Sequence, residues 1–199
     1  MSPLAGADSN EDDRPASARS REYTEVRLAE FIPKLRIAVR IAQPGREPTT
    51  GFFSLAPQAQ FHEGPETLLE RLNTPDRVLP FQRHADNAVV LISRLELEWV
   101  ATGPGVNEDW ICPPTFAVTR EERVRVRFKS GDEIEGLLRM ELPELVNRAS
   151  DFLNGSEDFF ALVTTDGVRL VNKHAVLDTR VYESSPLPIG NLDTDLEAL

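Results

Sequence analysis

The run of residues from Arg123 to Lys129 combines residue types and spacing that could bind a charged partner. Arg123, Arg125 and Arg127 alternate with apolar residues, so on a β-strand their guanidinium groups would share one face, and Lys129 extends this basic stripe. Such a row of cations could hold the phosphates of RNA or an acidic peptide. The competing interpretation is a solvated strand face that carboxylates neutralise across the sheet. The carboxylates expected to pair with the stripe in this way are Glu121, Glu133 and Glu135.

The histidines and the cysteine form no recognisable catalytic or metal-binding set. The sequence holds no phosphate loop, dinucleotide fingerprint, zinc-protease helix motif or nucleophile elbow. His62, His84 and His174 stand in unrelated segments without the close-spaced partners of a metal site, and Cys112 precedes two prolines rather than a base. Many acidic residues gather in turns, where carboxylates are usually solvated. We therefore expect a protein that is not an enzyme and that needs no metal or cofactor.

Composition narrows the class of protein further. Of 199 residues, 33 are acidic and 22 are basic, and the formal net charge of -11 makes nucleic acid an unfavoured partner. A hydrophobic content of 40% suits one large or two small globular domains, and the single cysteine excludes an internal disulfide. No apolar run approaches the roughly 20 residues that span a bilayer, and the first residues lack the basic region of a signal peptide. A soluble cytoplasmic protein is expected.

The two ends of the sequence differ from its middle. Residues 1–22 are polar and contain few large apolar side chains, which predicts a disordered tail. Residues 183–199 form an acidic tail without Lys or Arg. Leu192, Leu196 and Leu199 follow one another there at helical spacing, so they could present one apolar face to a partner.

Between the tails, the sequence contains an internal repeat. Residues 36–41 and 123–128 both alternate between apolar and polar types, which is typical of a strand with one buried face, and the alignment pairs Ile37 with Val124. A glycine-containing turn follows each run. Further pairs of segments are the strands 50–55 and 135–140, the short helices 65–73 and 143–154, the strands 77–81 and 158–163, the strands 89–92 and 168–171, and the final stretches 95–100 and 175–181.

These pairs predict a mainly β fold of the α+β class, built from two β-β-α-β-β units in tandem. The first unit covers residues 23–102 and the second covers 119–182, with a Pro- and Gly-rich linker at 103–118. Units of this size lie near the lower limit for independent folding. We therefore expect the two units to share a core about a pseudo-two-fold axis.

Each unit resembles the small β-barrels of the Sm-like and SH3-like families. The resemblance lies in the hydrophobic strand, glycine turn and glycine-bearing second strand of residues 124–138, and in residues 168–177, which are similar to later strands of those folds. It implies barrel-like geometry. The RNA-binding signature of Sm-like proteins is not carried over, because the helix of residues 143–154 and the pair Asn172-Lys173 occupy the corresponding places.

Three functions stay open at this level. The leading hypothesis is a non-catalytic protein-interaction or adaptor module whose partner is another protein, and which could also self-associate through exposed strand edges. The first alternative is RNA binding through the strand Arg123 to Lys129. The second is small-ligand binding or catalysis at the junction of the two units, where several aromatic residues could line a pocket. These aromatic residues are Phe81, Trp99, Trp110 and Phe160.

Overall fold

The computed structural model describes residues 35–103, 106–114, 116–141 and 148–182, all of which belong to the unit Lys34–Leu199. The fold is mainly β, as the alternating sequence predicted: in the described part of the chain ten antiparallel strands form one sheet, accompanied by a few short helices. The two predicted tails lie outside the described residues, and so do Leu192, Leu196 and Leu199.

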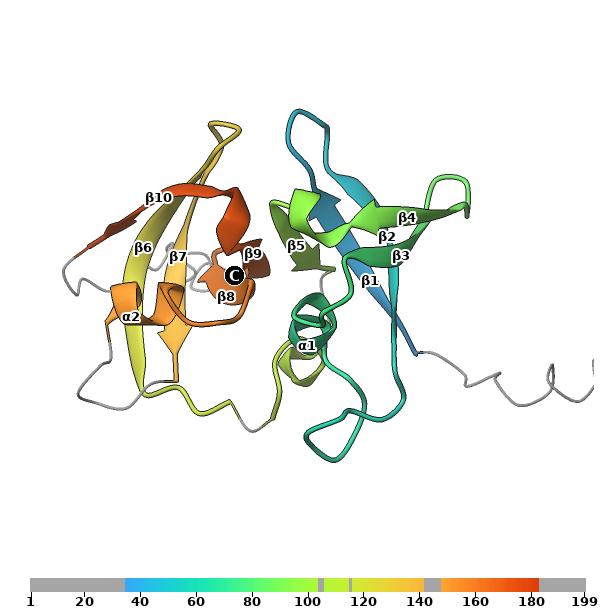
Figure 1. Cartoon of the computed structure of the whole chain (residues 1–199), viewed down its shortest axis with the longest axis horizontal. Helices are drawn as coiled ribbons and strands as arrows, with labels where there is room; N and C mark the ends of the chain where they lie inside the picture. The colour runs from blue at the N-terminus through green and yellow to red at the C-terminus, as the bar shows by residue number, and fades with distance from the viewer. Residues whose placement is uncertain (1–34, 104–105, 115, 142–147, 183–199) are drawn as a thin grey trace, which may run out of the picture. The chain divides into compact units, whose positions relative to one another are not determined.

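The described elements follow one another in two series (Figure 1). The first series comprises β1 (Leu35–Ala42), β2 (Thr49–Leu55), α1 (Leu68–Leu72), β3 (Val78–Arg83), β4 (Val89–Ser93), the 3-10 helix η1 (Arg94–Glu96) and β5 (Trp99–Thr102). After η2 (Glu108–Trp110), the second series comprises β6 (Arg120–Phe128), β7 (Glu133–Met140), α2 (Ala149–Leu153), β8 (Phe159–Thr164), β9 (Gly167–Asn172), η4 (Lys173–Ala175) and β10 (Val176–Val181).

The two series meet in a seam between β5 and β9, where Trp99 lies opposite Val171. The strand order is β10-β6-β7-β8-β9-β5-β1-β2-β3-β4. A two-fold axis would join like edges, such as β5 to β10 or β4 to β9. The seam instead joins the fifth strand of one series to the fourth strand of the other, so the expected pseudo-two-fold arrangement is wrong.

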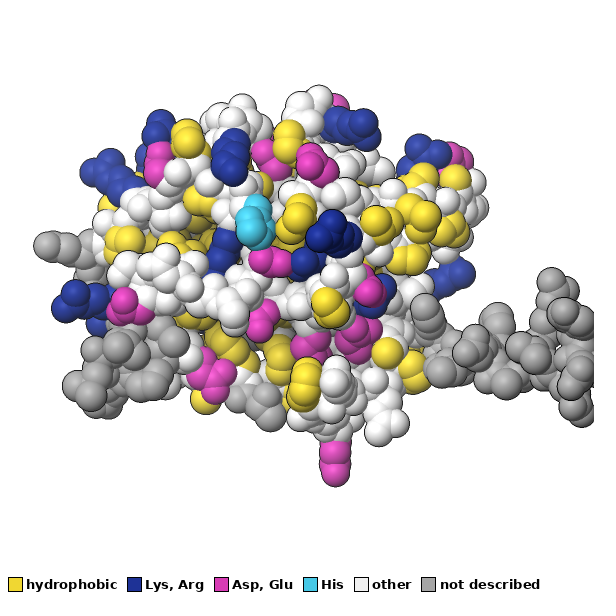
Figure 2. All heavy atoms as spheres, in the orientation of Figure 1, with side chains coloured by type: hydrophobic (Ala, Val, Ile, Leu, Met, Phe, Trp, Pro, Cys, Tyr) yellow, Lys and Arg dark blue, Asp and Glu magenta, His cyan; other side chains and the backbone are white. Residues whose placement is uncertain are grey.

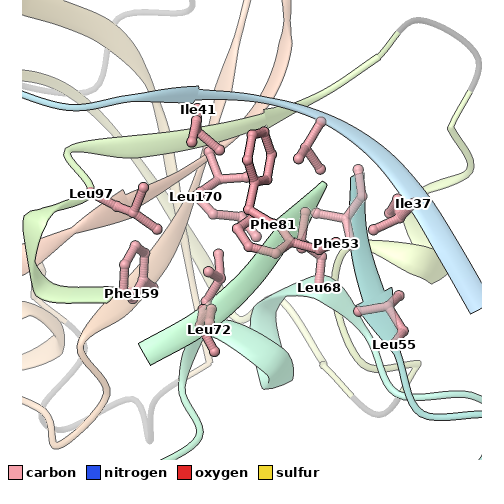
Figure 3. Close-up of a cluster of buried hydrophobic side chains, with 14 of the residues drawn as sticks. Ile37, Ile41, Phe53, Leu55, Leu68, Leu72, Phe81, Leu97, Phe159 and Leu170 are labelled. Atoms are coloured by element: carbon pink, nitrogen blue, oxygen red, sulfur yellow. The ribbon is translucent and has the colours of Figure 1, made fainter. Parts of the chain in front are cut away.

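Two clusters of buried side chains form the core instead of one. The first cluster belongs mainly to β1–β5 and α1, but Phe159 and Leu170 of the second series lie within it, beside Leu97 and Leu72 (Figure 3). The second cluster belongs mainly to β6–β10 and takes in Trp99 of the first series. Each cluster is therefore completed across the seam, and the seam buries apolar surface on both sides.

The strand register corrects the alignment of the two halves. Gly51 lies opposite Val39, and Gly136 lies opposite Val124, so Val39 rather than Ile37 holds the place of Val124. Both glycines are crowded: a Cβ atom would stand 2.3 Å from the carbonyl oxygen of Gln82 at Gly51, and 2.5 Å from that of Val163 at Gly136. Only a residue without a side chain allows the next strand to approach this closely.

Helix α1 is shorter than the sequence suggested. It begins at Leu68, because Thr67 caps it: the Thr67 hydroxyl accepts from the Glu70 N–H, and the Glu70 carboxylate accepts from the Thr67 N–H. Pro65 therefore precedes the helix. Helix α2 begins at Ala149, and residues 143–147 of the predicted helix lie outside the described residues.

None of the described helices is long and apolar enough to cross a membrane.

Candidate functional site

The basic stripe lies on the outer face of β6, at one end of the sheet. The predicted alternation is confirmed: Val124, Val126 and Phe128 are fully buried, while Arg125 and Arg127 are exposed. The structure thus places the guanidinium groups on one face, as the spacing indicated.

Carboxylates on the neighbouring strands neutralise most of this stripe. Glu135 of β7 accepts hydrogen bonds from Arg123 and, at 3.0 Å, from Arg125 Nη2. The bonds from these two arginines hold the pKa of Glu135 below its ordinary value. Asp178 of β10 pairs with Arg127. The stripe is therefore a ladder of ion pairs across β7, β6 and β10, which is a stabilising arrangement for a strand face.

The remaining members of the stripe also have partners nearby. Lys129 Nζ donates to the carbonyl oxygen of His174 at 2.6 Å. Tyr182 makes cation–π contacts with three arginines: the guanidinium carbons of Arg123, Arg125 and Arg180 lie 5.2 to 5.8 Å from the centre of its ring. Sequence reasoning missed Tyr182 because it follows the last strand and belongs to no motif.

The three histidines stand apart from one another, each with its own local contact. His62 Nε2 lies 3.0 Å from a carboxylate oxygen of Glu70, and His174 Nε2 lies 2.7 Å from Asp158 Oδ1. His84 stacks edge-on against Phe52. Among the described residues, no group of three potential ligating side chains could hold a metal ion.

Asp158 connects the two series of strands. Its second oxygen, Oδ2, lies 2.7 Å from Arg94 Nη1, and Arg94 also donates to the carbonyl oxygen of Leu72 at 2.9 Å. Burial acts to raise the pKa of Asp158, but the hydrogen bonds from His174 and Arg94 outweigh it and hold the pKa below its ordinary value. Asp158 is therefore an ionised link in the seam rather than an acid with a proton to give.

A cavity of about 610 Å³ lies between α1, α2 and β8. Apolar side chains dominate its surface. They come from both series and from the connecting segment, and they include Leu69, Phe116, Phe152, Phe159 and Phe160. Of the four aromatic residues expected at the junction, Phe160 alone is among the residues that line this cavity: Phe81 and Trp99 are buried in the two cores, and Trp110 packs against the first.

Carboxylates line the cavity together with these apolar side chains, which we call its floor, and we call the carboxylates its acidic rim. They are Glu66, Glu70, Glu141, Asp151 and Glu157. Two of them are fixed by local structure: Glu66 accepts from the Ala56 N–H at 2.8 Å, and Glu70 accepts from both Thr67 and His62. Burial acts to raise the pKa of Glu70, but these hydrogen bonds prevail and lower it, so the carboxylate stays ionised.

One cation, Lys173, also lines the cavity, and its charge is directed at the end of α2. Its Nζ donates to the carbonyl oxygens of Phe152 at 3.1 Å and Gly155 at 3.2 Å. Burial lowers the pKa of Lys173, although the nearby Glu157 and Asp158 act to raise it. These bonds satisfy carbonyl oxygens at the C-terminus of α2. The charge of Lys173 is therefore directed at the helix end, and negative charge predominates along the cavity.

No protein-family model, curated protein or solved structure matches this sequence. The cavity has no signature that a motif search could find, because its lining comes from four separate segments between residues 60 and 173. The one available signal was the pair of short helices that each end in Leu-Asn, since both helices flank the cavity.

Proposed function

We propose that this chain is a non-catalytic protein-binding module that holds an apolar, cationic segment of a partner protein in the cavity between α1 and α2. The observation that carries the proposal is that aromatic side chains and, among the described residues, five carboxylates line the same cavity. The volume of the cavity falls within the roughly 300–1,000 Å³ of ligand-binding pockets.

The floor accounts for the apolar part of the partner. Leu69 and Phe152 are partly buried, so their apolar surface is available to a guest side chain, whereas Phe159 and Phe160 are held rigidly in the two cores. A rigid apolar floor lowers the entropic cost of binding, because the pocket does not have to be ordered by its guest. Large apolar side chains are the usual anchors of such contacts.

The rim accounts for the charge of the partner. In the described part of the chain, five carboxylates and one lysine line the cavity, which favours Lys or Arg on either side of the anchoring side chain. The net charge of -11 attracts a cationic segment from a distance. Glu70 is kept ionised by Thr67 and His62. A carboxylate held in this state suits electrostatic binding better than proton transfer.

The two alternative functions have less support. RNA binding through Arg123 to Lys129 would compete with the ion pairs to Glu135 and Asp178, which already satisfy three of the arginines. Small-ligand binding would use the same cavity as the proposed peptide. A small cationic apolar molecule could occupy the cavity as well. The two functions differ in one measurable respect: only a peptide-binding site gains affinity from residues on both sides of the anchoring side chain.

We propose further that the two series of strands arose by duplication, as tandem small-barrel-like units. Three correspondences support this. Gly51 and Gly136 are crowded by equivalent neighbours, and both α1 and α2 have a cation bonded to their last carbonyls, namely Arg94 and Lys173. In each series the fifth strand pairs with the first, and the fourth strand lies at the opposite edge of the five strands. This is the strand order of a partly open barrel.

The test of the binding proposal uses synthetic ten-residue peptides with one central Leu or Phe flanked by Lys and Arg. Fluorescence anisotropy with the full chain should show saturable binding of these peptides. Control peptides of the same length with Glu and Asp flanks, or with Ser at the centre, should not bind. The double variant Asp151→Lys with Glu157→Lys should weaken binding about tenfold or more, because both rim charges become repulsive.

A matched double variant, Glu47→Lys with Glu96→Lys, changes the net charge equally at exposed positions that do not line the cavity. It should leave the affinity within about twofold. Equal losses in both double variants would mean that only the overall charge matters, and the proposed site would be wrong. Failure of every cationic apolar peptide to bind would remove the proposal altogether.

A further inference from the structure

The outer face of the β3–β4 hairpin is apolar and exposed to solvent. Pro80 lies opposite Leu91 on this face, and Val78 and Val89 belong to it because alternate residues of a strand point the same way. Leu91 is 73% exposed, Val89 65% and Val78 47%. Figure 2 shows apolar side chains gathered over this end of the sheet. We call these four residues the β3–β4 face.

The same hairpin also carries a free edge. β4 is the last strand in the sheet order, so its outward N–H and C=O groups meet no further strand in the part of the chain that the structure describes. An edge strand with apolar side chains beside it is a template for pairing with another chain. The β3–β4 face therefore combines the two features of a docking surface in a sheet protein.

The corresponding hairpin of the second series shows how such a surface is covered. Phe159, Ala161 and Leu170 share one face of β8–β9, and they are 1%, 6% and 0% exposed. They pack into the first core beside Leu72 and Leu97, and β5 pairs with the edge of β9. At the seam, an apolar face and a strand edge are covered together.

We propose that a second copy of this chain pairs with the free edge of β4, in a two-fold dimer whose two β4 strands pair antiparallel and whose two β3–β4 faces lie side by side. The pairing continues the sheet antiparallel, as the pairing of β5 with β9 does at the seam. A two-fold axis brings like surfaces together, so apolar residues meet apolar residues on both sides. It also satisfies the free backbone groups of both β4 edges at once.

The other free edge, β10, makes a poor alternative partner for β4. At the seam β5 offers Trp99 and Val100, which are buried, whereas β10 offers the charged Asp178 and Arg180 beside the apolar Leu177 and Val181, and all four are exposed. In a head-to-tail chain of copies, β4 of one copy would pair with β10 of the next. Such a chain would therefore place charged residues where the seam has apolar ones. These charges would lie beside Ile92 of β4, on the face opposite to Leu91, and burying them there carries a free-energy cost.

The seam ion pair adds a second argument against head-to-tail growth. Arg94 meets Asp158 across the seam at 2.7 Å. If the two series correspond as proposed, Lys173 takes the place of Arg94 and Arg77 takes that of Asp158. Two cations would then face each other in a head-to-tail contact, and like charges in register destabilise it.

The test measures the mass of the full chain by sedimentation velocity and light scattering. The wild type should show a dimer that dissociates on dilution. Leu91→Lys should be monomeric over the same concentrations, because it places two ammonium groups in the interface. Leu177→Lys is the matched control: Leu177 is 59% exposed on the opposite edge strand, and this variant should remain dimeric.

Hydrogen exchange on the same samples identifies the edge that is used. The amides of β4 should become more protected as the dimer forms, while those of β10 should not change. A wild type that stays monomeric at all concentrations overturns the proposal, and so does a dimer that survives Leu91→Lys. Masses that keep growing with concentration, with β10 protected, would establish head-to-tail assembly instead. Protection of β4 that does not depend on concentration would show that a segment of the same chain covers it.

Discussion

Two hairpins of this protein have the same pattern of strand pairing and opposite surroundings. In β8–β9, Leu170 lies opposite Ala161 and both are buried in the first core. In β3–β4, Leu91 lies opposite Pro80 and both are exposed. The hairpins themselves are built in the same way, so the difference comes from what covers them. Burial in this fold is set by the order of strands in the sheet as much as by the apolar pattern of each strand.

The features common to both series stabilise each half by itself. The crowded glycines Gly51 and Gly136 let neighbouring strands approach, and Arg94 and Lys173 bind the last carbonyls of the two helices. The features that differ belong to the seam. Asn172 is completely buried there, and its side chain donates to the carbonyl oxygens of Leu95 and Leu97 and accepts from the His174 N–H.

The largest expected effect comes from truncating the two paired leucines. Leu170→Ala should lower the free energy of unfolding by about 3 kcal/mol, because it leaves a cavity in a fully buried place. Leu91→Ala should change it by less than about 0.5 kcal/mol when the protein is dilute and monomeric. Urea denaturation followed by circular dichroism measures both. Similar losses in the two variants would mean that the two hairpins are equally covered, and the comparison would fail.

The glycines should respond alike in the two halves. Gly51→Ala and Gly136→Ala should each destabilise by about 2 kcal/mol, because the new Cβ would stand within 2.5 Å of a backbone oxygen that cannot move freely. Gly103→Ala is the control, since no atom lies within 4 Å of its Cβ position. The same denaturation experiment applies. A loss in one half without a loss in the other would argue against the equivalence of the two series.

Exchanging the seam residue for its counterpart should have a smaller effect. Asn172→Ser should cost about 1–2 kcal/mol, because the carbonyl oxygens of Leu95 and Leu97 would lose a buried donor. The reciprocal variant Ser93→Asn should be close to neutral, since Ser93 is exposed and its side chain makes no cap hydrogen bond. Thermal unfolding of both variants checks the difference. Equal shifts would show that Asn172 acts only as a local cap of η4.

The strands could be predicted from the sequence, but their positions relative to one another could not. Alternation with period two identified β1 and β6 and assigned their buried faces correctly. It aligned Ile37 with Val124, whereas Val39 is the residue that lies opposite a glycine as Val124 does, because a shift of two residues leaves every side chain on the same face. The turn after each strand can differ in length between the two segments, so the turn glycines do not fix the alignment either.

The seam and the cavity lay beyond sequence reasoning for a different physical reason. β5 has only four residues, and nothing in Trp99–Thr102 specifies β9 as its neighbour. The choice depends on the whole apolar surface that the two series bury together. The neutralisation of the arginines was foreseen in part: Glu135 was expected as a partner, whereas Asp178 comes from β10, whose register with β6 shifts at an irregularity.

The smallest expected effect concerns His62, which lies beside the rim of the cavity. Hydrogen bonds to the Glu63 carbonyl and to the Glu70 carboxylate raise the pKa of His62 above 6.5, and the pKa of Glu70 lies below 4.5. A raised histidine pKa means that protonation stabilises the folded chain: the contribution is complete below the unfolded pKa and is lost as pH rises through the folded value. The Glu70 contribution has the opposite sign and is lost at low pH. His62→Gln should therefore reduce stability most between about pH 5 and pH 6, and less at pH 8. Urea midpoints across this range, with exposed His84→Gln as the control, measure the effect. A difference between wild type and His62→Gln that does not vary with pH would mean that the ion pair with Glu70 contributes nothing to the loop beside the cavity.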